Sequence, residues 1–242
     1  MTESKISFSH VSKCYDDNIV LNDVNFEIQT GEFITVVGRS GCGKTTLLRL
    51  INGLLQPDHG TVAINGKDIT FQDPITLRRS IGYVIQGIGL FSHLNIKRNI
   101  EFIPCLLKYD KKRCDEISRR LISVVGLPEE MLSRYPSELS GGQQQRIGIA
   151  RALAASPDIV LMDEPFGALD EMTRNYLQNE IKKIQQELNL TIIFITHDLK
   201  EAAKLGDRIF IMNRGKIVMD TTPEKTIRIY EKDPLNFFGM DS

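Results

Sequence analysis

The sequence predicts an α/β fold with a mainly parallel central sheet, an antiparallel β flank and an inserted helical subdomain. Three observations support this fold class. Apolar, β-branched runs of strand length recur along the chain, and one of them leads through a glycine-rich loop into a helix-compatible segment. A later stretch has the 3.6-residue periodicity of amphipathic helices. With 242 residues, of which 41% are hydrophobic, the chain suits one large domain with a substantial core.

The N-terminal part of the chain predicts the antiparallel flank. Residues 6–11, 20–28 and 61–64 alternate between apolar and polar side chains, as half-buried strands do. Asn65-Gly66 follows the third of these segments and is a strong hairpin-turn signal. We therefore expect a small antiparallel sheet outside the central one.

The central sheet is predicted from strands that are apolar on both faces. Residues 33–37 form such a run and lead directly into the glycine-rich loop, after which residues 45–51 suit a helix. Similar strand signals recur further along the chain, at residues 81–85, 159–162, 191–196 and 208–212. Their two-sided apolar character favours a mainly parallel sheet covered by helices.

Helical periodicity predicts the inserted subdomain, which we place at about residues 88–140. Ile117, Leu121 and Val124 have helical spacing, and Gly126-Leu127-Pro128 is expected to end that helix. A second amphipathic stripe is expected to pack against the sheet; it consists of Leu177, Ile181, Ile184 and Leu188. The tail, residues 223–242, is expected to be a short helix followed by a frayed end, and Asn236-Phe237-Phe238 is weak evidence for docking.

Composition excludes several function classes. With 30 basic and 31 acidic residues the net charge is −1, so nucleic acid is not an expected partner. No apolar run approaches the ~20 residues that span a bilayer, which predicts a cytosolic chain. The four cysteines have no CxxC spacing, and we expect reduced structural thiols.

Gly38-Arg39-Ser40-Gly41-Cys42-Gly43-Lys44-Thr45 has the GxxxxGK[ST] pattern of a phosphate-binding loop. Glycines allow backbone conformations in which successive N–H groups surround phosphate oxygens, and the following helix adds its N-terminal dipole. Lys44 is expected to place its ammonium on the β- and γ-phosphates, and Thr45 its hydroxyl on Mg²⁺. The side chain of Cys42 is expected to fill space in the loop and not to act as a redox switch.

Polar residues at strand ends supply further candidates. Asp163 and Glu164 follow the apolar run 159–162; Asp163 is expected to hold the hydration shell of a metal ion, and Glu164 to polarise an attacking water. Gln86 and His197 follow two other predicted strands, at the edge where α/β sheets place their ligand crevice. A lone residue there is usually a cap or core residue, but the shared location favours function.

Leu139-Ser140-Gly141-Gly142-Gln143 is a second glycine-bearing loop, and it has no pocket of its own to complete. It is best explained as the cap on a nucleotide bound by another copy of the chain. Two such loops together indicate a dimeric ATP-driven protein.

With these motifs in place, the chain resembles the nucleotide-binding subunits of ABC transporters over nearly all of its length. The resemblance implies a P-loop NTPase (RecA-like) core and a head-to-tail dimer, in which ATP lies between one copy's phosphate loop and the other copy's second glycine loop. It implies catalytic roles for Lys44, Gln86, Glu164 and His197, and Mg²⁺ contacts from Thr45, Gln86 and Asp163. The nucleotide contacts that it implies are Tyr15 on adenine, Gly38, Arg39, Ser40, Gly41, Cys42, Gly43, Lys44, Thr45, Thr46, Ser140, Gly141, Gly142, Gln143 and the D-loop residue Asp170.

A narrower resemblance, to the ATPases of glycine betaine, carnitine and choline importers, lies in residues 81–86 and 88–91, with His93 and Asn99-Ile100. Gly87 and Ser92 depart from it, because relatives often have Gln and Pro there. It implies transmembrane permease partners, an indirect solute-binding protein partner and a peripheral location at the cytoplasmic face of the membrane. Many relatives carry a C-terminal CBS pair; the chain stops too soon for one, so no CBS regulatory domain is expected.

Other functions remain as alternatives. The chain could serve a transporter for another small solute, such as an amino acid. A non-transport ABC ATPase acting on ribosomes or DNA is disfavoured, because such proteins usually carry two cassettes or a long coiled coil. A non-hydrolysing scaffold is disfavoured, because Lys44, Glu164 and His197 are all present.

Overall fold

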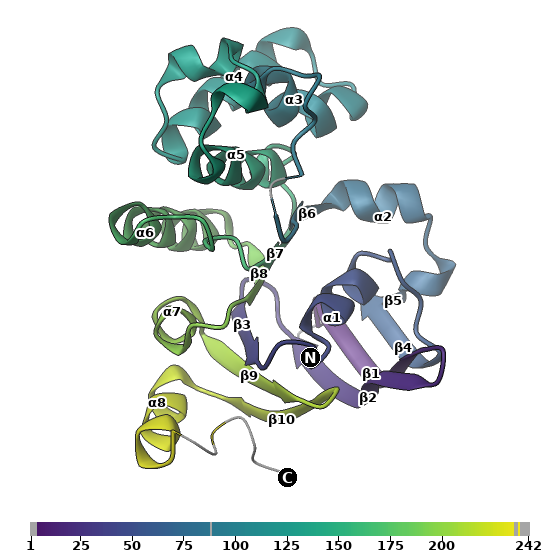
Figure 1. Ribbon diagram of the computed structural model, residues 1–242. Coiled ribbons are helices and arrows are strands. Elements are labelled where there is room, and N and C mark those ends of the chain that lie inside the picture. Colours follow the sequence, from purple (N-terminus) through teal and green to yellow (C-terminus); the bar gives the residue numbers. More distant parts are fainter. Residues whose placement is uncertain (1–3, 88, 235–236, 238–242) are drawn as a thin grey trace. The chain divides into compact units, whose positions relative to one another are not determined.

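The computed structural model describes residues 4–87, 89–234 and 237 and divides the chain into two compact units (Figure 1). Unit 1 comprises residues 1–78 and 189–242, and unit 2 comprises residues 79–188. None of the described helices has the length and apolar character needed to cross a bilayer.

Unit 1 contains the predicted antiparallel flank as a sheet in the order β2-β1-β4-β5. β1 and β2 pair over a longer stretch than expected, so that Tyr15, expected to lie before the first hairpin, is the last residue of β1 and pairs with Asn18. Asn65 and Gly66 make the β4–β5 turn with φ of 51° and 70°, as predicted. The strands are β1 (Ile6–Tyr15), β2 (Asn18–Ile28), β4 (His59–Ile64) and β5 (Lys67–Asp68).

A second group of strands in unit 1 runs in the order β10-β9-β3-β8. β3 pairs in parallel with both β8 and β9, whereas β10 joins β9 as an antiparallel edge. Every residue of β3 and β8 is buried, which confirms the two-sided burial expected from their apolar runs. The strands are β3 (Phe33–Gly38), β8 (Thr191–Ile195), β9 (Arg208–Asn213) and β10 (Lys216–Thr221).

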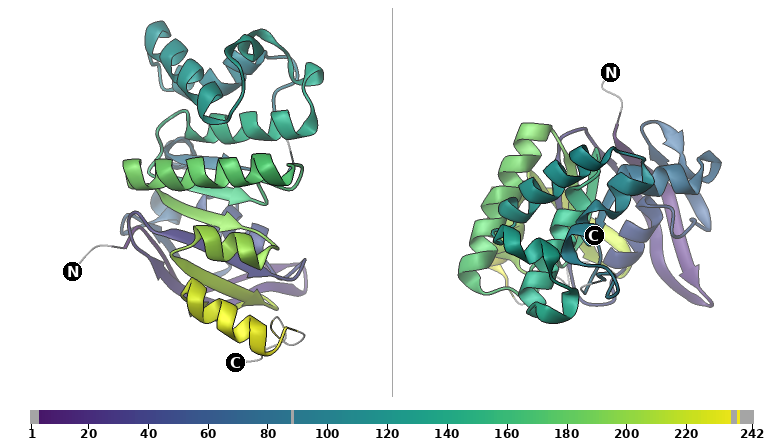
Figure 2. Two further views of the ribbon diagram at one scale, coloured as in Figure 1. Left: turned by 90° about the vertical axis from the view of Figure 1, so that its left-hand side faces the viewer. Right: turned by 90° about the horizontal axis from the view of Figure 1, so that it is seen from above.

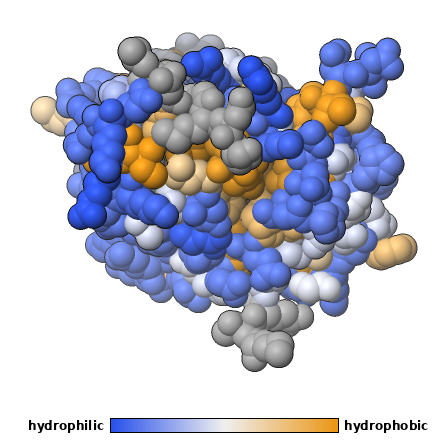
Figure 3. Space-filling view, turned by 90° about the horizontal axis from the view of Figure 1, so that it is seen from below, coloured by the Kyte–Doolittle hydropathy of each residue, from blue (hydrophilic) through white to orange (hydrophobic). Residues whose placement is uncertain are grey.

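The helices of unit 1 are short. They are α1 (Lys44–Ile51), η1 (Ile69–Phe71), α7 (Leu199–Leu205) and α8 (Pro223–Lys232), and α2 (Pro74–Ser80) runs across the boundary between the two units. Figure 2 shows α7 and α8 lying one after the other along β9 and β10. The face that Figure 3 shows is largely hydrophilic, with hydrophobic side chains gathered among the polar ones.

The tail departs from the expected frayed end. α8 forms as predicted, but Phe237 is 1% exposed and packs with Val37, Ala202 and Ile209 in a core cluster. Its ring also meets Tyr230 of α8 edge to face, with centroids 5.3 Å apart. Asn236 and Phe238, named with it above, lie outside the described residues. The prediction of a frayed end was therefore wrong at Phe237. Burial of the aromatic ring in this apolar cluster stabilises the chain end by more than the loss of its conformational entropy costs.

Unit 2 combines one parallel strand pair with a set of helices. β6 (Ile81–Val84) and β7 (Ile159–Asp163) pair in register, so that Val84 lies opposite Met162. α4 ends at Val124, and Gly126 follows with φ of 64°. This confirms the helix end that the glycine in the sequence predicted. The helical elements are α3 (Ile96–Leu106), α4 (Lys111–Val124), η2 (Glu129–Ser133), η3 (Pro136–Glu138), α5 (Gly141–Leu153) and α6 (Glu171–Leu188).

Burial of α6 follows the predicted stripe only in part. Leu177 and Ile181 are buried, whereas Leu188 at the helix end is 49% exposed. The apolar face of this helix is therefore covered in its middle and not at its ends, since Met172 near the start is 84% exposed.

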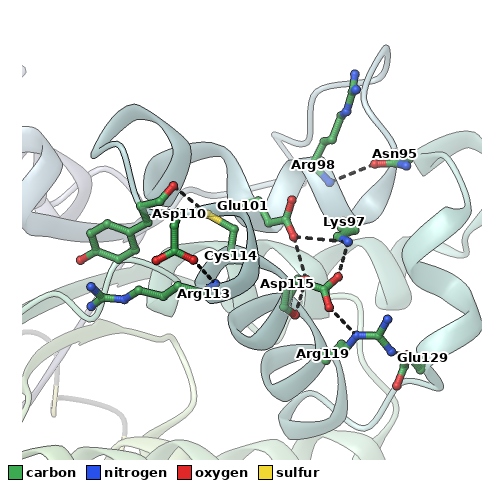
Figure 4. Close-up of polar contacts among 12 residues, drawn as sticks. Asn95, Lys97, Arg98, Glu101, Asp110, Arg113, Cys114, Asp115, Arg119 and Glu129 are labelled. Carbon is green, nitrogen blue, oxygen red and sulfur yellow. Dashed lines mark hydrogen bonds and ion pairs between the residues drawn. The ribbon is translucent and has the colours of Figure 1, made fainter.

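An ion-pair network joins α3, α4 and η2 (Figure 4). Asp115 of α4 pairs with Lys97 of α3 and with Arg119, whose guanidinium also pairs with Glu129 of η2. These partners hold the pKa of Asp115 below its usual value, with the Lys97 hydrogen bond as the largest cause. The helical region is thus held together by surface charge as well as by its core.

Candidate nucleotide site

The phosphate-binding loop connects β3 to α1. Gly38 ends the strand and Lys44 begins the helix, so residues 39–43 form the loop itself. Gly41 and Gly43 have φ of 78° and 106°, a backbone region that side-chain-bearing residues rarely adopt. A Cβ on Gly43 would also lie 2.7 Å from the carbonyl oxygen of Val20, whereas one on Gly41 would meet nothing within 4 Å. Gly43 is therefore required by packing and conformation, and Gly41 leaves an open side to the loop.

Lys44 lies inside the curve of this loop. Its side chain is buried, and its ammonium donates hydrogen bonds to the carbonyl oxygens of Gly38 at 2.8 Å and Arg39 at 2.9 Å. The Sγ atom of Cys42 lies 4.0 Å from the same ammonium, and burial raises the pKa of that thiol. A neutral, buried thiol fits the filler role expected for Cys42 and not a reactive one. The loop thus places a positive charge beside the N-terminus of a helix, which is the electrostatic arrangement of a phosphate site.

The other candidates of unit 1 differ in exposure. Arg39 and Ser40 are exposed, Thr45 is half-buried and Thr46 is buried at the start of α1. Tyr15 is 40% exposed, so part of its ring is available for stacking on a base. His197 is exposed in the short connection between β8 and α7, where Asp198 caps the helix by accepting from the Lys200 and Glu201 amides.

The acidic pair of unit 2 lies at the end of β7. Asp163 is the last residue of that strand and is buried, whereas Glu164 is half-buried and follows with φ of 47°. Gln86 is exposed two residues beyond the end of β6. Because β6 and β7 are parallel and paired, Gln86 and the two carboxylates follow neighbouring strands at the same edge. The structure therefore brings these three candidates to one edge, as expected.

Ser140 is the N-cap of α5. Its Oγ accepts from the Gln143 amide at 3.3 Å, and the Gln143 side-chain oxygen accepts from the Ser140 amide at 2.9 Å. This is a reciprocal capping box, and α5 begins at Gly141. Gly141 is exposed and has open space around its Cα, so the helix N-terminus can be approached closely.

Asp170 stands at the start of α6. Its Oδ1 accepts from the Thr173 amide at 2.9 Å, and this backbone hydrogen bond is the main cause that lowers the pKa of Asp170. The aspartate therefore caps a helix, whatever else it contacts. Its carboxylate is ionised at neutral pH.

The candidates divide between the two units. Unit 1 holds Tyr15, residues 38–46 and His197, and unit 2 holds Gln86, Ser140 to Gln143, Asp163, Glu164 and Asp170. Among the described residues there is no cluster of three His, Cys, Asp or Glu side chains suited to a metal. The hydroxyl of Thr45, the amide of Gln86 and the carboxylate of Asp163 are oxygen donors of the kind Mg²⁺ takes when a nucleotide supplies its other ligands.

Sequence reasoning missed Gln145, a buried residue of α5 whose side-chain amide contacts the backbone of Glu164 and Ala168. The signal was limited to the third glutamine of the run that begins at Gln143, on a helix face shared with Gly141 and Ile149. Polar residues at such positions usually face solvent, so the sequence pattern alone did not identify it.

Comparison with known proteins gives consistent matches. The family profile described as "ABC transporter" matches residues 21–167. The chain is 53% identical to the carnitine transport ATP-binding protein OpuCA of Listeria monocytogenes, over 98% of this chain and 59% of that protein. It is 52% identical to the choline transport ATP-binding protein OpuBA of Bacillus subtilis (strain 168), over 92% of this chain and 59% of that protein. The chain thus spans about three fifths of the length of these relatives.

Solved structures show the same fold. The dimeric structure of MJ0796, described as a bacterial ABC transporter cassette, is similar with a TM-score of 0.84 and 34% identity, covering 90% of this chain and 98% of that one. The likeness therefore extends over nearly the whole of a cassette.

Proposed function

This chain belongs to the ABC transporter family, and from that premise we propose that it binds and hydrolyses ATP to power import of a quaternary ammonium osmoprotectant. The observation that supports ATP binding most strongly is the buried Lys44 ammonium, held by the carbonyl groups of Gly38 and Arg39 at the start of α1. A point charge fixed there by its own loop is positioned for the β- and γ-phosphates without further rearrangement of the backbone.

In the proposed hydrolysis, the residues at the strand ends have different roles. Water attacks the γ-phosphorus, and Glu164 orients that water and accepts its proton while ADP leaves. Thr45, Gln86 and Asp163 would hold Mg²⁺, which when bound would neutralise charge on the transferred phosphoryl group. Lys44 balances the remaining negative charge, His197 contacts the γ-phosphate, and Tyr15 stacks on adenine.

The proposed active form is a head-to-tail dimer of two copies. The capping box at Ser140 leaves the Gly141 and Gly142 amides at the N-terminus of α5 for the partner's γ-phosphate, with Gln143 and Asp170 beside them. ATP then stabilises the closed dimer because it contacts both copies, and hydrolysis weakens those contacts.

The proposed cargo class and partners follow from the relatives. Proteins named for carnitine and choline transport are more than half identical to this chain over more than nine tenths of its length. We therefore place the chain at the cytoplasmic face of the membrane, bound to permease subunits that receive solute from a binding protein. Specificity for the solute then belongs to those partners.

ATP hydrolysis by the purified chain tests the enzymatic part. Phosphate release should require Mg²⁺ and nearly vanish in Glu164→Gln, which retains the size and hydrogen bonding of the side chain but not its basicity. Glu187→Gln is the matched control, since this exposed glutamate pairs with Lys183 on the surface of α6. Hydrolysis by Glu164→Gln at the rate of the unaltered chain would refute the assigned role.

Uptake of labelled glycine betaine, carnitine and choline tests the cargo. Cells lacking this chain should lose uptake of at least one of the three and regain it with the unaltered chain but not with Glu164→Gln. Uptake that is unchanged by the deletion for all three solutes would contradict the proposed cargo class.

A further inference from the structure

The side chain of Gln145 bridges two backbone groups of the loop that follows Glu164. Gln145 lies on α5 and is 6% exposed, and buried amides require hydrogen-bond partners. Its Oε1 accepts from the Ala168 amide at 3.1 Å, and its Nε2 donates to the carbonyl oxygen of Glu164 at 3.5 Å. Both ends of the amide are thus used on one short loop, which lies between the acidic pair and Asp170.

Glu164 has a backbone conformation that needs such support. Its φ of 47° lies in the left-handed region, which is costly for a residue with a side chain. It also precedes Pro165, and residues before proline favour an extended backbone with negative φ. Strain of this kind persists only where surrounding contacts fix it, and the carbonyl group of Glu164 accepts from Gln145 and, at 3.5 Å, from the Gly167 amide.

A second contact holds the same loop against α5. A Cβ added to Gly142 would lie 3.1 Å from the carbonyl oxygen of Ala168, so the first turn of α5 packs closely on the loop backbone. Gln145 is five residues beyond the Ser140 cap, a rise of about 7.5 Å along the helix. Close packing at Gly142 and the amide bridge at Gln145 therefore act on the loop from successive turns of one rigid helix.

We propose that Gln145 is a positioning residue for ATP hydrolysis: it fixes the left-handed backbone at Glu164 and thereby aims the carboxylate at the attacking water. This rests on the proposed function, in which Glu164 is the base. Because φ of Glu164 sets the direction of its Cα–Cβ bond, a change at its peptide group moves the carboxylate directly. The same bridge ties the base of one copy to the helix that caps the other copy's nucleotide.

Gln145→Met tests this proposal, because methionine has similar volume and no hydrogen-bonding amide. The rate constant kcat, counted per bound nucleotide, should fall between about 10-fold and 100-fold, as expected for a base displaced by roughly 1 Å. Affinity for MgATP should not change, since the side-chain hydrogen bonds of Gln145 go to the loop that follows Glu164. A merely structural role would reduce the amount of folded protein. Expressing the turnover rate per bound nucleotide corrects for that loss.

Gln178→Met is the matched control. Gln178 is also a buried glutamine of unit 2, but it lies on α6 and not on α5. Its substitution should leave kcat per bound nucleotide unchanged. A Gln145→Met variant with the kcat of the unaltered chain, or an equal fall in both variants, would overturn the proposal.

Hydrogen exchange in the unaltered chain gives a test that needs no variant. Ala168 is exposed, so its amide should exchange slowly only because Gln145 accepts its hydrogen bond. Rapid exchange of that amide would overturn the bridge. Normal hydrolysis by Glu164→Gln would instead refute the proposed function, so the two failures are distinguishable.

Discussion

Removal of the Lys44 side chain should weaken the protein even before nucleotide binds. In Lys44→Ala, the carbonyl groups of Gly38 and Arg39 each lose a hydrogen bond from the ammonium. Gly38 is buried, so its carbonyl group is left without water as a substitute, whereas Arg39 is exposed and can be rehydrated. The structure therefore predicts one unsatisfied buried acceptor in the variant.

The expected loss of stability follows from this one unsatisfied acceptor. An unsatisfied buried acceptor costs about 1–3 kcal/mol. For a protein of this size, 1 kcal/mol corresponds to a shift in melting temperature of about 2–4 °C. Lys44→Ala should thus lower the melting temperature of the nucleotide-free chain by about 2–12 °C. Arg49→Ala, which removes an exposed cation from the same helix, should change the stability by less than about 0.5 kcal/mol.

Thermal unfolding with and without MgATP checks both roles of Lys44. At a nucleotide concentration about 100 times the Kd, binding should stabilise the unaltered chain and Arg49→Ala by about 2.7 kcal/mol. Lys44→Ala should show no such gain, because its loop has lost the buried ammonium that is placed for the phosphates. An unchanged melting temperature without nucleotide would refute the structural role, and an equal gain with MgATP would refute the phosphate role.

Three further changes have defined outcomes. Phe237→Ala should lower the free energy of unfolding, measured by denaturant titration, by about 3–5 kcal/mol. Removal of the buried ring leaves a cavity in the core cluster that contains Phe237. Gly43→Ala should abolish MgATP binding measured by calorimetry, since the added Cβ would lie 2.7 Å from the carbonyl oxygen of Val20 and would strain the loop. Asp115→Asn should lower the melting temperature at pH 7, and the difference from the unaltered chain should vanish in acid. In the folded protein the pKa of Asp115 is held below its ordinary value of 3.8. The stabilisation from ionised Asp115 is therefore fully present above pH 3.8 and is lost as the pH falls through the pKa of the folded state.

Each of these changes has a result that would count against it. Phe71→Ala is the control for the tail, because Phe71 is 89% exposed, and equal losses in the two phenylalanine variants would mean that Phe237 is not docked. Full MgATP affinity in Gly43→Ala would show that the loop tolerates a side chain. A stability difference between Asp115→Asn and the unaltered chain that persists at a pH at which Asp115 is protonated would exclude the ion pairs as its cause.

The sequence predicted the parts of the fold whose causes are local. The β3 run, the left-handed Gly43 and the Asn65-Gly66 turn follow from backbone preferences that a short segment carries with it. The capping box of Ser140 and Gln143 also has a local sequence pattern, which could have identified Ser140 as the N-cap of α5.

The rest depends on contacts between distant segments. Phe237 is buried because β3, α7 and β9 together present an apolar surface, which a pair of aromatic residues near a chain end does not reveal. Gln145 is buried because a loop 19 residues further along the chain supplies its partners. A buried glutamine and an exposed one have the same sequence pattern on a helix, so only the folded chain distinguishes them.

Light scattering of the Glu164→Gln variant tests the central claim most directly. If ATP is held between two copies, the variant should double its mass in MgATP, because it binds nucleotide but does not hydrolyse it, and should return to a monomer when ATP is removed. Gly43→Ala combined with Glu164→Gln should stay monomeric, since its phosphate loop cannot take the nucleotide. A Glu164→Gln chain that binds MgATP to saturation and still remains a monomer would contradict the account.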